Sequence, residues 1–309
     1  MKFRLIALIF IAILSELIAL AFFQDINIVR FLSYLVSILF ILFLKYRLNN
    51  QNVYFLFQFT LFLLLGIYYF PNIFFFTQSD DVVVVFTLSL IGLLLNLFNR
   101  TRSLITTTIL IFIMIFISII SDVKTLTAAI LFFPILILVK RFVFKNLLNH
   151  PFHFYLIIPL LVICLVFIIG SEFPLLRVLG ARDYMWANVL FGEEFANEYF
   201  YNSFSTYSNL KLGHLSQNNV HSLFVGTLSR FNLLTGILNL FIFAIIINST
   251  FKKILVNNWK IQFSMFIIIL FGLFSGRSFL SMDDMSVIWW VSVFGFTKYS
   301  INKNSSLKE

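Results

Sequence analysis

Long apolar runs alternate with short polar connections along almost the whole chain. Crossing the hydrocarbon core of a bilayer takes about 20 helical residues, with a tolerance of ~17–25. Ten runs approach or reach that length: Leu5–Phe23, Ile28–Leu44, Val53–Phe70, Val82–Phe98, Ser103–Ile120, Thr125–Val139, Phe154–Gly170, Leu234–Ile247, Ile261–Ser275 and Met285–Thr297. The pattern predicts an all-α integral membrane protein with about ten transmembrane helices, forming one polytopic domain over residues 1–309.

The composition agrees with this prediction. Of the 309 residues, 61% are hydrophobic and 11% are charged, whereas ordinary soluble domains are ~45–50% apolar and ~25% charged. Such a composition excludes a soluble protein, and the single cysteine, Cys164, excludes a disulfide scaffold. The net charge of +9 first suggests nucleic acid. However, the basic residues form small clusters between apolar runs, so no nucleic-acid partner is expected and the lipid bilayer is.

The distribution of basic residues predicts the topology. Odd-numbered connections, counted from the N-terminus, contain 15 of the 22 basic residues: Lys2, Arg4, Lys45, Arg47, Arg100, Arg102, Lys140, Arg141, Lys145, Lys252, Lys253, Lys260, Lys298, Lys303 and Lys308. Cytoplasmic loops carry such an excess. Both termini are therefore expected in the cytoplasm.

The first run has an alternative interpretation as a cleaved signal peptide. Lys2 and Arg4 give it a positive start, and Ala19-Leu20-Ala21 resembles a cleavage site. The bulky Phe22-Phe23 and the length of the run favour a retained helix instead.

One outer connection, residues 171–233, is much longer than the others. It is rich in Phe, Tyr and Trp, which is not the composition of a disordered segment. Long connections in compact proteins are usually functional. We therefore expect a folded lid or cavity wall with short helices, which contains most of the polar residues that a site could use.

Two segments of this connection are notable. The first is Gly180-Ala181-Arg182-Asp183-Tyr184-Met185-Trp186, with Gly192 ten residues after Arg182. The second starts at His221-Ser222 and continues with apolar residues at helical spacing to Arg230. Ser222 is expected to cap a short helix, which leaves His221 before the N-terminus, where amide donors favour an anionic ligand.

These residues resemble the O-antigen polymerase and ligase superfamily of bacterial membrane proteins. Arg182 and Trp186, Gly192, His221-Ser222, Arg230 and Gly236 follow the order and topology of that family's motifs over about 70 residues. Three features depart from the family pattern: Ser222 replaces the commoner Asn, Asn232 stands where a Gly is usual, and the chain is short. The ligase branch tends to have an acidic residue near the end of the half-helix, where this chain has Arg230, which favours a polymerase.

The resemblance implies a GT-C-like fold in the bacterial inner membrane, with the active site on the outer face. It implies transfer of a growing glycan from undecaprenyl diphosphate to a sugar hydroxyl of another lipid-linked oligosaccharide, without metal or other cofactor. The products would be O-antigen, capsule or exopolysaccharide, and a chain-length regulator in the membrane is a candidate partner.

The residue types suit this chemistry. Guanidinium groups form bidentate hydrogen bonds with phosphate and stabilise the charge of a departing diphosphate, so Arg182 and Arg230 are assigned to it. A histidine, whose ordinary pKa is about 6.5, suits proton removal from the acceptor hydroxyl; His221 is assigned this role and His214 is its competitor. Arg277 is a third candidate phosphate ligand, and Trp186 and Tyr184 are candidates for stacking on sugars.

Each assignment has a structural alternative. An outer arginine beside a span can be a headgroup anchor, and loop aromatics often form the interfacial belt or pack a lid. The pairs Asp80-Asp81 and Asp283-Asp284 lack the spacing of a metal–nucleotide-sugar site, so no metal is expected.

Glu16 lies inside the first predicted span, where a carboxylate is costly and suggests function by default. The interpretation favoured by the sequence is a structural ion pair with Arg30 of the next span. Two rival functions also remain open: a transferase that uses Asp25 in the first outer loop, and a transporter or flippase of lipid-linked sugars.

Overall fold

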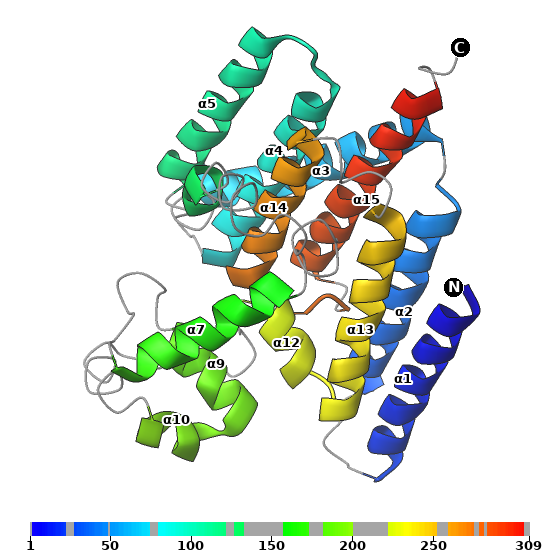
Figure 1. Cartoon of the computed structure of the whole chain (residues 1–309), viewed down its shortest axis with the longest axis vertical. Helices are drawn as coiled ribbons and strands as arrows, with labels where there is room; N and C mark the ends of the chain where they lie inside the picture. Colours follow the sequence, from blue (N-terminus) through cyan, green and yellow to red (C-terminus); the bar gives the residue numbers. More distant parts are fainter. Residues whose placement is uncertain are drawn as a thin grey trace, which may run out of the picture. The chain divides into compact units, whose positions relative to one another are not determined.

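The computed structural model describes residues 2–22, 28–48, 50–74, 80–121, 127–132, 157–172, 182–199, 222–251, 259–274, 278–280 and 283–305. Within these ranges all regular secondary structure is helical and no β-strand occurs (Figure 1). The all-α class expected from the hydropathy pattern is confirmed. The chain forms two compact units, each assembled from stretches that are far apart in the sequence.

The first unit comprises Met1–Leu35, Phe152–Ile247 and Gly272–Ser281. Its helices are α1 (Lys2–Phe22), the start of α2 (Ile28–Tyr46), α7 (Ile158–Glu172), α9 (Arg182–Phe191), α10 (Glu193–Tyr199), α12 (Leu223–Ser229) and most of α13 (Leu233–Phe251). The first half of α2 lies beside α13 (Figure 1), with the Tyr34 hydroxyl donating to Asn239 Oδ1 at 2.8 Å. The connection 171–233 thus contains the short helices α9, α10 and α12, as predicted.

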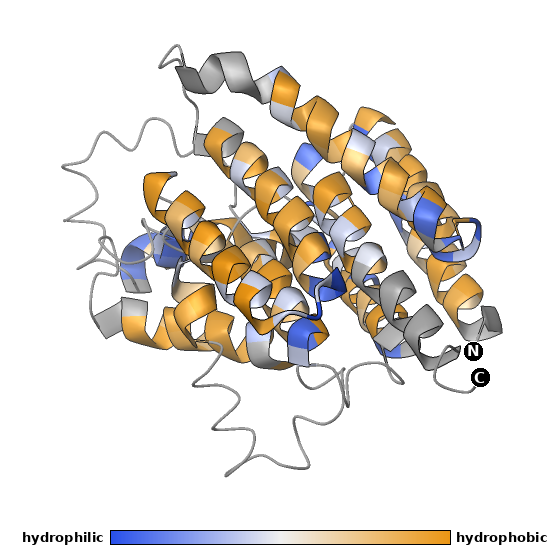
Figure 2. Ribbon diagram, turned by 90° about the horizontal axis from the view of Figure 1, so that it is seen from above, coloured by the Kyte–Doolittle hydropathy of each residue, from blue (hydrophilic) through white to orange (hydrophobic). Residues whose placement is uncertain are grey.

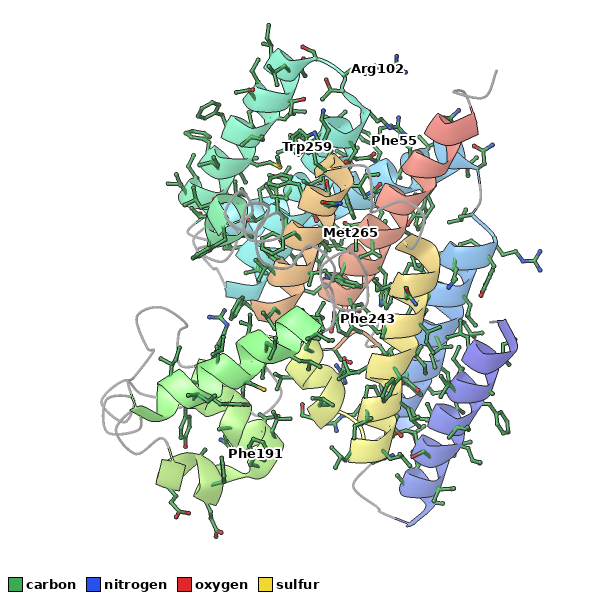
Figure 3. The ribbon with its side chains drawn as sticks, viewed as in Figure 1. Phe55, Arg102, Phe191, Phe243, Trp259 and Met265 are labelled. Carbon is green, nitrogen blue, oxygen red and sulfur yellow. The ribbon has the colours of Figure 1, made fainter. Side chains whose placement is uncertain are left out.

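The second unit comprises Val36–Pro151, Asn248–Phe271 and Met282–Glu309. It contains the second half of α2 together with α3 (Gln51–Phe74), α4 (Asp80–Arg100), α5 (Leu104–Ile120), most of α14 (Trp259–Phe274) and α15 (Asp284–Ser305). Helices α3, α4 and α15 pack against one another. The Phe98 ring meets Trp259 edge-on, with centroids 5.7 Å apart; Trp259 is labelled in Figure 3.

Hydrogen bonds between side chains cross the interior of the second unit. Asn96 Nδ2 on α4 donates to Gln58 Oε1 on α3 at 2.9 Å. The hydroxyl of Tyr54, also on α3, donates to the backbone oxygen of Val291 on α15 at 2.7 Å. Interhelical amide and hydroxyl bonds of this kind are common between helices that pack in an apolar medium.

Helices of the structure coincide with nine of the ten predicted spans. Of the remaining predicted span, Thr125–Val139, only residues 127–132 are described, and they are helical. Two helical segments, Ile28–Tyr46 and Val83–Arg100, are long and apolar enough to cross a membrane. Most of the described ribbon is hydrophobic (Figure 2). Membrane crossing by these two segments and by the shorter apolar helices, and hence the count of ten spans, stays a prediction.

Candidate functional site

Helix α9 begins at Arg182, the first of the arginines assigned to the diphosphate. Arg182 is half-buried, and Asp183 beside it is fully buried. An acidic residue in the first turn interacts favourably with the partial positive charge of a helix N-terminus. Asp183 belongs to the quoted segment but has no role assigned from the sequence; its position directly after Arg182 at a helix start is the available signal.

The two aromatic residues of α9 are buried against protein. The Trp186 ring stacks on Phe274, with centroids 5.9 Å apart and planes at 21°, and meets Phe167 of α7 edge-on at 6.5 Å. Trp186 is 0% exposed. The Tyr184 hydroxyl donates to Asn197 Oδ1 at 2.7 Å. Both side chains therefore hold α9 in place here, which is the packing alternative that the sequence left open.

Gly192 joins α9 to α10 and has a φ of +98°. Residues that have a side chain rarely adopt this left-handed backbone conformation, so glycine is favoured there. Its N–H donates to the oxygen of Asn188 at 2.9 Å, and its own oxygen accepts from Ala196 N at 3.1 Å. The Gly192 joint therefore redirects the chain so that α10 returns along α9.

Helix α12 is the short helix predicted after His221, and the prediction is confirmed. Ser222 caps it, since its hydroxyl accepts from the backbone N–H of Val225 at 3.3 Å. Arg230 is the C-cap residue, and its N–H donates to the oxygen of Gly226 at 3.0 Å. The two residues assigned to acceptor and diphosphate, His221 and Arg230, thus flank this helix in sequence.

A hydroxyl contact joins α12 to the segment that follows Arg277. Thr227 Oγ1 lies 3.1 Å from Ser278 Oγ and accepts from the backbone N–H of Phe279 at 3.0 Å. Both Thr227 and Ser278 are fully buried. Sequence reasoning missed this bridge, because a Thr and a Ser 51 residues apart give no local signal.

Three phenylalanines extend the same junction to α13. The ring of Phe243 on α13 (labelled in Figure 3) stacks on Phe279, with centroids 4.4 Å apart and planes at 12°. Phe224 of α12 meets both rings edge-on, at 5.7 Å and 4.8 Å. Edge-to-face and stacked pairs of this kind add to the stabilisation from burial alone.

Gly236 allows α12 and α13 to approach closely. A Cβ at this position would lie 2.9 Å from the backbone oxygen of Leu228 and 3.0 Å from its Cα. Backbone atoms cannot move aside as a flexible side chain can. A larger residue would therefore push α12 away from α13.

The turn between α12 and α13 is held by α1 and α2. Phe231 packs on the ring of Tyr34, with centroids 4.8 Å apart. The side chain of Asn232 accepts from the N–H of Thr235 at 2.9 Å and so caps α13. Its Nδ2 donates to Glu16 Oε2 at 2.9 Å. Asn232, which departs from the family pattern, thus forms contacts that a glycine could not.

The described residues show no close ion pair between Glu16 and Arg30: Arg30 retains a longer-range electrostatic interaction with Glu16, and the close contact is with Asn232. Glu16 is 3% exposed and bonded to Asn232, whereas Arg30 lies on an exposed face of α2. The sequence does not show that a third helix, α13, places hydrogen-bond donors of its N-terminal turn beside Glu16.

The structure therefore gathers several elements that carry or adjoin the predicted site residues. Helices α9 and α12 contact each other, and both contact residues of the last stretch of the unit, through Trp186–Phe274 and Thr227–Ser278. His221, His214 and Arg277 lie outside the described residues. Their roles, like those of Arg182 and Arg230, stay predictions.

Among the described residues, no group of three or more His, Cys, Asp and Glu side chains is placed to hold a metal ion. Comparisons of the chain with protein-family models, with curated proteins and with solved structures found no match. The resemblance to the polymerase and ligase superfamily therefore depends on the quoted residues of the sequence alone.

Proposed function

We propose that this protein is a membrane-embedded glycosyltransferase that polymerises oligosaccharide repeat units carried on undecaprenyl diphosphate. The observation that carries the proposal is the bridge between Thr227 and Ser278. It joins the helix flanked by His221 and Arg230 to the residue that follows Arg277. The bridge thus supports the proposal because the described segments that it joins are the sequence neighbours of residues suited to phosphate binding and proton transfer.

The membrane setting is supported by the surfaces of the helices. Besides the two segments of spanning length, α5 exposes large apolar side chains; Leu104, Phe112 and Ile120 are 78%, 66% and 68% exposed. Water-exposed apolar surface of this extent is unusual in soluble monomers. Lipid is the environment in which such a helix face is stable, and the substrate carries a polyprenyl chain soluble in it.

In the proposed reaction, a hydroxyl oxygen of the acceptor sugar attacks the anomeric carbon of the donor glycan. The bond between that carbon and the diphosphate oxygen breaks, and undecaprenyl diphosphate leaves with the bonding electron pair. His221 takes the proton of the acceptor hydroxyl. Arg182 and Arg230, with Arg277, hold the diphosphate and stabilise the negative charge that develops on it.

The test is an assay with purified protein, lipid-linked repeat units and a chelator. Wild-type protein should build polymers in the presence of the chelator. His221→Ala should slow chain growth by about 10²–10⁴-fold, the usual contribution of a general base. His150→Ala is the matched control, since His150 is predicted on the cytoplasmic side, and it should retain full activity. His214→Ala distinguishes the competing base.

The products in cells separate the alternatives. A polymerase defect leaves single repeat units outside, still joined to the final acceptor, whereas a ligase defect leaves polymer on the lipid carrier. A transporter defect would trap repeat units on the cytoplasmic side. Trapping in Arg182→Ala or His221→Ala cells would contradict the proposed function.

A further inference from the structure

Glu16 is a buried acid that the proposed reaction does not use. It lies in the C-terminal half of α1 and is 3% exposed. A carboxylate in such a place is costly unless it is hydrogen-bonded, and intramembrane acids commonly mark functional positions. Its partners therefore indicate what it does.

The hydrogen-bond partners of Glu16 in the described structure all lie at the start of α13, while Arg30 of α2 interacts with it only electrostatically. Asn232 Nδ2 donates to Glu16 Oε2 at 2.9 Å, and the hydroxyl of Thr235 also interacts with the carboxylate. The neighbouring Ser15 adds two longer contacts with the Asn232 side chain, both of 3.3 Å. A negative charge at a helix N-terminus is favourable, because the backbone N–H groups there carry partial positive charge.

The same residues fix a short turn. Helix α12 ends at Ser229 and α13 begins at Leu233, so only residues 230–232 join them. Asn232 is tied to α1, and Phe231 packs on Tyr34 of α2. The remaining turn residue is Arg230. Its backbone therefore has little freedom while both neighbours are held.

We propose that Glu16 is a positioning residue for Arg230. By binding Asn232, it fixes the turn from which the Arg230 guanidinium reaches the diphosphate. This inference rests on the proposed function and adds a residue 214 positions away in the sequence to the machinery of that site. Errors of about 1 Å in such placements can lower a rate by about 10²-fold.

A matched contact on the same helix separates positioning from general packing. Tyr34 donates to Asn239 Oδ1 at 2.8 Å, and Asn239 is 1% exposed. This bond also joins α13 to the N-terminal helices, but it lies about two helical turns along α13 from the connection formed by residues 230–232. Asn239→Leu should therefore lower stability and leave the turn in place.

The experiment exchanges the hydrogen-bond donor and acceptor between Glu16 and Asn232. Asn232→Asp retains the cap of α13 but places two carboxylates against each other, which is strongly unfavourable. Adding Glu16→Gln restores a donor–acceptor pair of reversed direction. Two measurements are made in nanodiscs: saturating chain-growth rate with lipid-linked repeat units, and hydrogen exchange of the peptide that contains residues 228–236.

We expect Asn232→Asp to lower the saturating rate by about 10²-fold and to speed exchange of the turn by about tenfold, the effect of one lost hydrogen bond. The double variant Glu16→Gln, Asn232→Asp should recover most of both. Asn239→Leu should lower the midpoint of thermal unfolding and leave the saturating rate unchanged.

The positioning role is overturned if the double variant is no better than Asn232→Asp, or if Asn239→Leu loses as much chain growth as Asn232→Asp. Lack of chain growth by the wild-type protein would instead refute the proposed function. In that case the exchange measurement still tests whether Glu16 fixes the turn. Slow hydrogen exchange regained in the double variant would support this role of Glu16, and exchange as fast as in Asn232→Asp would refute it.

Discussion

Glu16 is a buried acid and Lys260 is a half-buried base. Each contacts a helix end whose partial charge is opposite to its own. Lys260 Nζ donates to the backbone oxygens of Thr101 at 2.9 Å and Phe98 at 3.4 Å, at the C-terminus of α4. It also donates to Thr107 Oγ1 at 2.8 Å. Glu16 instead meets the N-terminus of α13. Each charge thus complements the helix dipole that it faces.

The difference between the two lies in what each helix end adjoins. Lys260 holds the connection from α4 to α5, and neither of these helices carries a residue assigned to the reaction. Glu16 holds a three-residue turn that contains Arg230. The same physical interaction should therefore support stability alone at Lys260 and stability together with transfer at Glu16. Four substitutions test this contrast.

The largest effect is expected for Arg230→Ala. Removing one preorganised donor to a developing negative charge usually lowers the rate by about 10²–10³-fold. Arg230→Lys should lose less, because the charge remains while the planar fork is lost. Chain-growth rates and thermal unfolding of both variants provide the measurement; unchanged growth in Arg230→Ala would remove Arg230 from the site.

Lys260→Met should lower the free energy of unfolding by about 2 kcal/mol, since three acceptors lose a charged donor. The saturating rate per folded molecule should remain that of the wild type. Arg102→Met is the control, because Arg102 (labelled in Figure 3) is an exposed cation of the same connection. A loss of transfer in Lys260→Met without a loss of stability would contradict the contrast.

Gly236→Ala should lower the free energy of unfolding by about 1–3 kcal/mol, the usual cost of overpacking. It should also slow chain growth, because the added Cβ meets the backbone of Leu228, next to the turn. Gly66→Ala is the comparison variant: nothing lies within 4 Å of its added Cβ. That change should be neutral or stabilising, by up to ~1 kcal/mol. Equal effects of the two in thermal unfolding would argue against close approach of α12 and α13.

The smallest effect is expected for Arg30→Gln. Arg30 is exposed and Glu16 has its hydrogen bonds elsewhere, so unfolding should change by less than about 0.5 kcal/mol. Chain growth should be unchanged. A loss comparable with that of Asn232→Asp would restore the ion pair expected from the sequence.

Local features of the structure could be predicted from the sequence. Apolar run length predicted the helices, and Ser222 before Leu223 predicted the start of α12, because a cap acts over three residues. The C-terminal position of Arg230 follows from the same helix. In each case the interacting groups are neighbours in the chain.

The long-range contacts could not be predicted in the same way. Glu16 and Asn232 are 216 residues apart, and Thr227 and Ser278 are 51 apart. The hydropathy pattern predicts where along a helix a residue lies, but it does not predict which neighbouring helix the side chain contacts. For this reason the sequence does not show that Arg30 retains only a longer-range electrostatic interaction with Glu16. Trp186 was equally ambiguous, since stacking on a sugar and stacking on Phe274 require the same side chain.

The Gly192 joint has a consequence for how the outer segment can vary. Because the reversal depends on one residue without a side chain, α9 and α10 meet different surroundings although their sequences are continuous. Glu194 and Glu198 of α10 are exposed, whereas Trp186 and Ala187 of α9 are fully buried. Substitutions on α10 can therefore retune the charge presented to solvent without disturbing the anchored helix. Gly192→Ala, in contrast, would strain the reversal and pull Asn197 away from the hydroxyl of Tyr184.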